Sequence, residues 1–209
     1  MTPRIRILCA DDHRIVREGI ALILSQQPDM DVAGVAAGGT ECVALFRELR
    51  PDVTLMDLQM SAGGGLEAIR AIRSDAPTAK IIVLTMYAGD EDIHQAVSAG
   101  ASAYLLKSAI SDDLINLVRL VSRSPHAVLG PDIQRALDER AGRPQMTPRE
   151  KTILELVSQG LRDKEIARLS GISEHTVYVH LKSILGKLGA KDRTAAVRVA
   201  VKRGIIHMG

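Results

Sequence analysis

Short apolar runs alternate with amphipathic stretches over the first 124 residues. The apolar runs predict five strands, at Ile5–Cys9, Asp31–Ala36, Val53–Met56, Lys80–Leu84 and Ala103–Leu106. Apolar residues at helical spacing predict five helices, near Arg14–Gln26, Thr40–Leu49, Leu66–Ser74, Glu91–Ala99 and Asp112–Ser122. Because a helix follows each strand, we expect an α/β fold, a doubly wound (βα)5 parallel sheet of strand order 2-1-3-4-5.

From Thr147 onward the pattern is helical throughout. Thr147 to Glu150 form a capping box with proline at the first helical position, which indicates a helix start. Glycines then separate four expected helices, at Pro148–Ser158, Asp163–Ser170, Glu174–Leu188 and Arg193–Arg203. Only Gly171, Ile172 and Ser173 lie between the second and third, with Ser173 as N-cap. This tight turn is typical of a helix-turn-helix in an all-α four-helix domain.

The organisation that follows has two domains, at residues 1–124 and 147–209. Residues 125–146 contain three prolines and two glycines and are interpreted as a linker, with one short helix at Asp132–Glu139. A length of 209 residues suits two small domains. Only four residues are aromatic, so both cores are expected to be aliphatic.

The location expected from the sequence is the cytoplasm. The longest apolar runs are shorter than the roughly 18 residues that span a bilayer, and the beginning of the chain has no pattern of a signal peptide. The two cysteines, Cys9 and Cys42, make no disulfide framework, and Cys9 falls in a strand pattern that favours the core. We therefore expect no membrane partner and a reducing environment.

The net charge of +2 hides an asymmetry along the chain. Residues 1–124 carry 12 basic against 16 acidic side chains, a balance of −4. Residues 147–209 carry 12 basic against 6 acidic side chains, a balance of +6. The basic part suits a polyanionic partner, although many small domains carry such a charge.

Five polar side chains fall where the predicted parallel strands end: Asp11, Asp12, Asp57, Thr85 and Lys107. Ligands bind beyond the carboxyl ends of the strands in such a sheet. Three converging carboxylates repel each other unless a cation lies among them, and their oxygens suit Mg²⁺. One carboxylate could then attack a phosphoryl group, while Lys107 offsets its charge and Thr85 donates a hydrogen bond to it.

Each of these residues taken singly has an ordinary structural explanation, because aspartates after strands usually cap or turn the chain. All five side chains are expected at the same edge of one sheet, and this common position favours a functional site. A flavin-binding domain would want a loop rich in serine, threonine and glycine after the first strand, where this chain is acidic. A phosphatase of the haloacid dehalogenase type would want a second aspartate at the position of Gln59.

Residues 1–124 resemble a receiver domain. The resemblance rests on Asp11-Asp12-His13, Leu55-Met56-Asp57-Leu58, Leu84-Thr85, Ala99-Gly100-Ala101 and Tyr104-Leu105-Leu106-Lys107. It implies that Asp57 is the phosphoacceptor and that Asp12 and Asp57 hold Mg²⁺. Asp11 would act mostly through a metal-bound water, and the backbone carbonyl of Gln59 would be a further ligand.

The same resemblance implies a switch. Thr85 and Lys107 would hold the phosphoryl group, and Tyr104 would turn inward when Thr85 moves. From the residues alone, Tyr104 is as well explained as a half-buried strand residue. Ser61 and Gly64 depart from the family pattern, which usually has proline and an aspartate or asparagine there. We expect a mobile Ser61–Gly65 loop and a looser start to the third helix.

The helix expected at Glu174–Leu188 has an apolar face and an opposite face that could enter a major groove. Its N-terminal half would meet base edges through Thr176, Tyr178, Val179 and Lys182. Lys164, Ser183 and Lys187 are better placed for phosphates. A solvated helix face is the ordinary alternative, and the tight turn and basic balance favour DNA.

Residues 147–206 resemble the LuxR-type helix-turn-helix, and the whole chain resembles the NarL/FixJ family of response regulators. The motifs are Thr147-Pro148-Arg149-Glu150, Lys164-Glu165-Ile166-Ala167, Ile172-Ser173, Thr176-Val177 with Val179-His180, and Lys187-Leu188-Gly189. The resemblance implies a homodimer on inverted half-sites of double-stranded DNA, with the last helix at the dimer contact. The family most often has lysine at the position of Tyr178 and a polar residue at that of Gly186.

The function expected is that of a phosphorylation-controlled transcription regulator of a two-component system, with a sensor histidine kinase as phosphoryl donor. The receiver would catalyse its own phosphorylation without turning over free substrate, so the chain is not expected to be an enzyme. Two alternatives remain at this point. One is a constitutive DNA-binding regulator whose receiver only dimerises, and the other is a phosphatase or phosphotransfer enzyme with a protein-binding tail.

Overall fold

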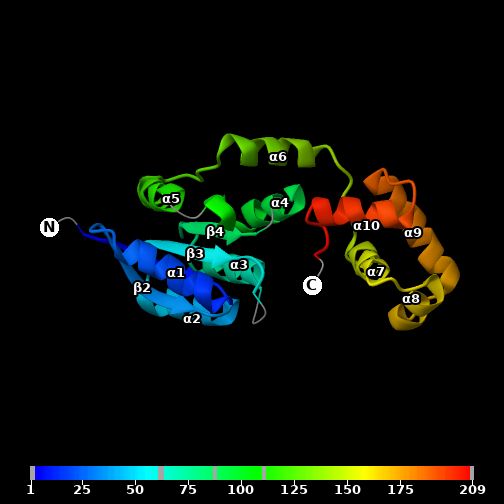
Figure 1. The fold of residues 1–209 in the computed structure, drawn as a ribbon, viewed down its shortest axis with the longest axis horizontal. Helices are drawn as coiled ribbons and strands as arrows, with labels where there is room; N and C mark the ends of the chain where they lie inside the picture. The colour runs from blue at the N-terminus through cyan, green and yellow to red at the C-terminus, as the bar shows by residue number, and fades with distance from the viewer. Residues whose placement is uncertain (1–2, 61–63, 87–88, 110–111, 208–209) are drawn as a thin grey trace. The chain divides into compact units, whose positions relative to one another are not determined.

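The computed structural model describes residues 3–60, 64–86, 89–109 and 112–207 (Figure 1). The chain forms two compact units, one of Met1–Tyr87 with Ile93–Arg135 and the other of Ala88–Asp92 with Ala136–Gly209. The division after Arg135 falls inside helix α6 (Pro131–Ala141), which is longer than the short helix expected there. The limits of the two domains and the linker therefore stay a prediction. No helix in the described ranges is long and apolar enough to cross a membrane.

The first unit is built on one five-stranded parallel sheet. Its strands are β1 (Ile5–Ala10), β2 (Met30–Ala36), β3 (Val53–Asp57), β4 (Ile81–Thr85) and β5 (Ala103–Leu106). They lie in the order β2-β1-β3-β4-β5, and every neighbouring pair is parallel. This confirms the predicted α/β fold, and it makes the β1–β3 boundary the place where the strand order reverses.

Helices follow the strands as predicted, with ends that shift by at most one residue (Figure 1). They are α1 (Arg14–Ser25), α2 (Gly39–Leu49), α3 (Gly65–Asp75), α4 (Asp90–Ala99) and α5 (Asp112–Arg123). A short 3-10 helix, η1 (Lys107–Ala109), follows β5 and was not predicted. Ser111 precedes α5 and is a plausible N-cap by residue type, but it lies outside the described residues.

Helices α1 and α5 share one face of the sheet. Ile20 and Leu24 of α1 and Leu114 and Val118 of α5 are in one buried cluster with strand residues such as Ile82. Helix α2 packs against the opposite face, where Leu45, Leu49 and Leu8 surround Gly34 of β2. The core is aliphatic as predicted, and the described strands β3 and β4 are buried along their whole length. A sheet covered on both faces leaves the strand ends as the place for a site.

The second unit contains the four helices predicted near the C-terminus. They are α7 (Pro148–Ser158), α8 (Asp163–Ser170), α9 (Glu174–Leu188) and α10 (Arg193–Lys202). The capping box at Thr147 and the N-cap at Ser173 are both formed, and Gly171 ends α8 with a φ of 66°. Ile153, Ile166, Val177, Ile184 and Ala196 are among the buried residues of its core. Helices α8 and α9 therefore form the predicted helix-turn-helix.

Candidate functional site

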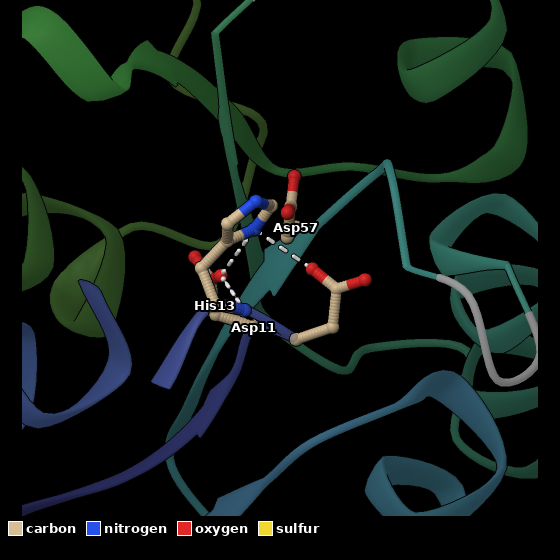
Figure 2. A group of neighbouring side chains, drawn as sticks. Asp11, His13 and Asp57 are labelled. Atoms are coloured by element: carbon tan, nitrogen blue, oxygen red, sulfur yellow. Dashed lines mark hydrogen bonds and ion pairs between the residues drawn. The ribbon is translucent and has the colours of Figure 1, made fainter. Parts of the chain in front are cut away.

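The carboxylates predicted for the pocket gather at the ends of β1 and β3 (Figure 2). Asp57 is the last residue of β3, and Asp11 follows directly after β1. The two strands are neighbours, with Ala10 opposite Met56, so their C-terminal ends meet at one edge. Asp11 and Asp57 are each 2% exposed. Parallel pairing thus brings together two acidic side chains that are 46 residues apart in the chain.

Lys107 lies between the two aspartates and forms an ion pair with each of them. Its Nζ lies 2.7 Å from Oδ2 of Asp11 and 2.8 Å from Oδ2 of Asp57, and its side chain is 6% exposed. The end of β5 and the start of η1 direct it there. Burial alone would lower the pKa of Lys107, but its hydrogen bonds with both carboxylates raise that pKa overall. The pocket therefore holds a positive charge beside Asp57.

Backbone N–H groups donate hydrogen bonds to the other carboxylate oxygen of Asp57 and of Asp11. The N–H of Gln59 donates to Oδ1 of Asp57 at 3.2 Å, and the N–H of His13 donates to Oδ1 of Asp11 at 2.9 Å. The guanidinium of Arg17 on α1 donates to the backbone carbonyl of Asp11. These contacts orient both carboxylates before any ligand arrives. Such preorganisation is what a site for developing charge requires.

The acidic residues have the spacing of a metal site. Ligand atoms from Asp11, Asp12, Asp57 and His13 all lie within 4.8 Å of one another. Carboxylate oxygens at this spacing suit Mg²⁺, which binds one or two carboxylates and keeps several waters. The described residues therefore fit the ion expected from the sequence. His13 was not among the predicted ligands, and its place directly after Asp11 and Asp12 was the signal that could have found it.

Thr85 and Tyr104 lie on neighbouring strands beside this pocket. Thr85 is the last residue of β4 and is 1% exposed. It is opposite Leu106 of β5, two residues after Tyr104. Tyr104 is only 6% exposed and is thus more buried than an ordinary half-buried strand residue. The geometry brings Thr85 to the same strand-end edge as Asp57, whereas Tyr104 lies within the neighbouring strand.

The loop predicted to be mobile is described only at its end, because residues 61–63 lie outside the described residues. Gly64 and Gly65 are described, and α3 begins at Gly65 without a side-chain cap. Gly65 lies against the backbone of β3, since a Cβ added there would be 2.0 Å from the carbonyl oxygen of Asp57. The start of α3 thus touches the main chain of the residue at the centre of the pocket.

The second candidate site is the exposed face of α9. Tyr178 and Val179 are 59% and 51% exposed, although both are large and apolar. Lys182 is exposed on the same face, while Thr176 is half-buried and its hydroxyl lies 2.8 Å from that of Ser173. His175 is exposed three residues before Tyr178 and seven before Lys182, so it shares this face. His175 was not among the residues predicted for this face, although its helical spacing places it there.

Two of the predicted phosphate contacts, Lys187 and Ser183, also contact a buried glutamate of α7. Lys187 Nζ lies 2.6 Å from Oε2 of Glu150, and Ser183 Oγ donates to Oε1 of Glu150 at 2.7 Å. Glu150 is 3% exposed. Burial would raise its pKa, but the hydrogen bonds from Lys187, Thr147 and Ser183 lower the pKa to about 2. Lys164 is exposed on α8 and remains available to a polyanion.

Comparison with protein families agrees with the two sites. Residues 7–119 match the model of the response regulator receiver domain. Residues 144–200 match the model of bacterial regulatory proteins of the luxR family. The first match contains the whole acidic pocket, and the second contains α7 to α9 with most of α10.

Individual relatives resemble the chain over nearly its whole length. The response regulator protein VraR of Staphylococcus aureus (strain Mu3 / ATCC 700698) is 39% identical over 208 residues, which are 97% of this chain and 99% of that protein. The solved structure of the response regulator ChrA of a heme-sensing two-component system is 34% identical, with a TM-score of 0.56, and covers 97% of this chain and 99% of its own. The solved structure of the complex of the response regulator RcsB with DNA is 26% identical, with a TM-score of 0.66. The match covers 95% of this chain and 98% of that chain.

Proposed function

The chain belongs to the response regulators that join a receiver domain to a LuxR-type DNA-binding domain, and we propose that phosphorylation of Asp57 controls its binding to DNA. The observation that carries this proposal is the bridge of Lys107 to Asp11 and Asp57 at 2.7 and 2.8 Å. A buried carboxylate with an ammonium group beside it is suited to accept a phosphoryl group. The contact of Lys107 with Asp57 at the strand-order reversal supports a nucleophilic role for this carboxylate.

The proposed step is phosphoryl transfer from a phosphohistidine of a sensor kinase. A carboxylate oxygen of Asp57 attacks phosphorus, the phosphorus–nitrogen bond breaks, and the nitrogen retains the electron pair. Lys107 offsets the charge of the transferred group, and the Thr85 hydroxyl donates a hydrogen bond to one of its oxygens. The receiver catalyses this step on itself and turns over no free substrate, so we do not count the chain as an enzyme.

Mg²⁺ is the cofactor of this proposal, as receiver domains bind it at an acidic cluster of the kind formed by Asp11, Asp12 and Asp57. When bound, it would neutralise charge on the phosphoryl oxygens. Asp12 and Asp57 would be direct ligands, and Asp11 would act mostly through water. The backbone carbonyl of Gln59 is proposed as a further ligand.

The proposed output is a change of conformation that favours DNA binding. The phosphoryl group draws Thr85 toward Asp57, and Tyr104 follows into the space that Thr85 leaves. Only a phosphoryl group that binds one conformation better than the other can shift the population. The expected result is a homodimer on inverted half-sites of double-stranded DNA, with α10 at the dimer contact. A regulator of this kind acts where the chromosome is, which places it in the cytoplasm.

The DNA contacts proposed for α9 are those on its exposed face. Tyr178, Val179 and Lys182 project from the face that is opposite the buried Val177 and Ile184. Thr176 completes the base-edge set, and Lys164 of α8 is proposed for a phosphate. Ser183 and Lys187 are weaker candidates than the sequence suggested, because Glu150 already binds them.

The test of the proposal is an intact-mass measurement after incubation with acetyl phosphate and Mg²⁺. Wild type is expected to gain the mass of one phosphoryl group, and Asp57→Asn is expected to gain nothing. Asp31→Asn is the matched control, because Asp31 is an exposed aspartate on β2 and is not a pocket ligand. Lys107→Ala is expected to slow the gain strongly.

The same samples then test control over DNA. Phosphorylated wild type is expected to bind its promoter DNA more tightly than unphosphorylated wild type and than Asp57→Asn. Equal affinity with and without the phosphoryl group would favour the constitutive regulator whose receiver only dimerises. Turnover of a generic phosphate ester would favour the phosphatase reading.

A further inference from the structure

The imidazole of His13 lies beside the carboxylates of the acidic pocket. It adds a nitrogen ligand to a set that otherwise contains only oxygen atoms. We propose that His13 is a nitrogen ligand that lets this pocket bind Zn²⁺ as well as Mg²⁺. The proposal rests on the metal site proposed above, and it adds a ligand and a second metal to that site. Figure 2 shows the ring of His13 beside Asp11 and Asp57, with its nitrogen turned toward the carboxylates.

The distances fit one ion shared by His13 and the carboxylates. The Nδ1 atom of His13 is 2.9 Å from Oδ1 of Asp12 and 3.6 Å from Oδ1 of Asp11. Ligands about 2 Å from a tetrahedral Zn²⁺ are roughly 3.3 Å from one another. The two distances from Nδ1 lie on either side of that value. The ligand atoms of Asp57 complete a set that lies within 4.8 Å.

The local structure leaves the ring available for this role. His13 is the N-cap of α1, a position where serine or aspartate side chains usually accept a hydrogen bond from the helix. The His13 side chain makes no such capping bond, and Nδ1 is directed to the carboxylates instead. The side chain is 69% exposed, so an ion can reach it from solvent.

The chemistry separates the two metals. Mg²⁺ prefers oxygen ligands, whereas imidazole nitrogen suits Zn²⁺ and other late first-row ions. Removal of the His13 ring should therefore weaken Zn²⁺ and leave Mg²⁺ nearly unchanged. An ion pair between a protonated His13 and the carboxylates would give no such selectivity, since a protonated ring offers no lone pair.

The experiment titrates the full chain with Zn²⁺ and with Mg²⁺ by calorimetry near pH 7.5. His13→Gln is expected to bind Zn²⁺ in the pocket tenfold or more weakly, and Mg²⁺ within about twofold of wild type. His126→Gln is the matched control, because His126 is an exposed histidine of the same unit and is not part of the cluster. It is expected to leave both affinities unchanged.

Nitrogen NMR of ¹⁵N-histidine-labelled chain supplies the direct readout. One imidazole Nδ1 signal, absent from His13→Gln, is expected to shift with Zn²⁺ but not with Mg²⁺. If Mg²⁺ binds and the His13 signal does not respond to Zn²⁺, the His13 proposal is wrong and the Mg²⁺ site stands. If neither metal binds wild type, the proposed metal site itself is overturned together with the role of His13.

Discussion

Lys187 in the last turns of α9 donates to Glu150 in the first turn of α7, with 2.6 Å between Nζ and Oε2. Glu150 is buried, and its other oxygen accepts from Ser183 of α9. The pair ties the start of α7 to the helix that carries the exposed Tyr178 and Val179. Lys187 is therefore only partly exposed, at 24%, and its charge helps to fix the position of α9.

Lys164 and Lys187 are therefore expected to differ in how they affect DNA binding. Lys164→Gln should reduce the slope of log K against log salt concentration by about 1, because an exposed lysine releases one counterion at a phosphate. Lys187→Gln should leave that slope nearly unchanged. Binding isotherms at four or five salt concentrations measure both. If only Lys187→Gln reduces the slope, Lys187 contacts a DNA phosphate and this expectation is wrong.

The pair should also matter for stability. Lys187→Gln leaves the carboxylate of Glu150 buried without its cation, and we expect a loss of about 2–4 kcal/mol in the free energy of unfolding of the helical unit. Urea unfolding followed by the NMR signals of α9 measures this. Lys191→Gln is the control, because Lys191 is exposed beyond the end of α9. The two variants should differ by more than about 1 kcal/mol.

The lowered pKa of the Glu150 carboxyl group predicts that the helical unit is less stable in acid. Its pKa is lowered from 4.5 to about 2 in the folded chain, so the folded state releases this proton more readily than the unfolded state. The associated stability is complete above pH 4.5 and is lost as the pH falls from 4.5 toward 2. Its size is about 3 kcal/mol.

Glu150→Gln checks this pH dependence, since glutamine keeps the shape of the side chain and has no proton to gain. Between pH 5 and pH 3 the free energy of unfolding of the helical unit should fall more steeply for wild type than for the variant. Parallel curves for the two proteins would contradict the assignment.

Gly65 should be intolerant of any side chain. A Cβ there would be 2.0 Å from the carbonyl oxygen of Asp57 and 2.8 Å from the Cα of Leu58, both backbone atoms that cannot turn away. Gly65→Ala should displace the end of β3 and slow phosphorylation from acetyl phosphate by tenfold or more. The control is Gly19→Ala in α1, where no atom lies within 4 Å of the added Cβ. That variant should phosphorylate at the wild-type rate.

Both cysteines should be inert in the folded protein. Burial raises the pKa of Cys9 and of Cys42 to about 12, and the two side chains are 1% and 0% exposed. The thiolate is the reactive form, so a disulfide reagent such as DTNB should modify neither residue at pH 8 within minutes. In urea both should react, and prompt labelling of the native chain would show that the core opens there.

The order of elements was determined by the sequence alone. The periodicity of apolar positions is local, so it predicts strands such as β4 and helices such as α5 without knowledge of the fold. One topological rule, that parallel strands end at one edge, then places Asp57 beside Asp11. Lys107 follows from the same rule. These predictions succeeded because they depend on backbone direction and not on side-chain rotamers.

The tertiary structure decided what the individual side chains touch. Glu150 was predicted as a capping residue and it does accept from the N–H of Thr147, but it also binds Lys187. That second contact joins residues 37 apart and depends on how α7 and α9 cross. The contacts of the His13 ring with Asp11 and Asp12 likewise depend on the side-chain rotamer of His13 at the N-terminus of α1. Spacing along a chain gives the face of a helix, and only packing between helices decides which charge on that face is already paired.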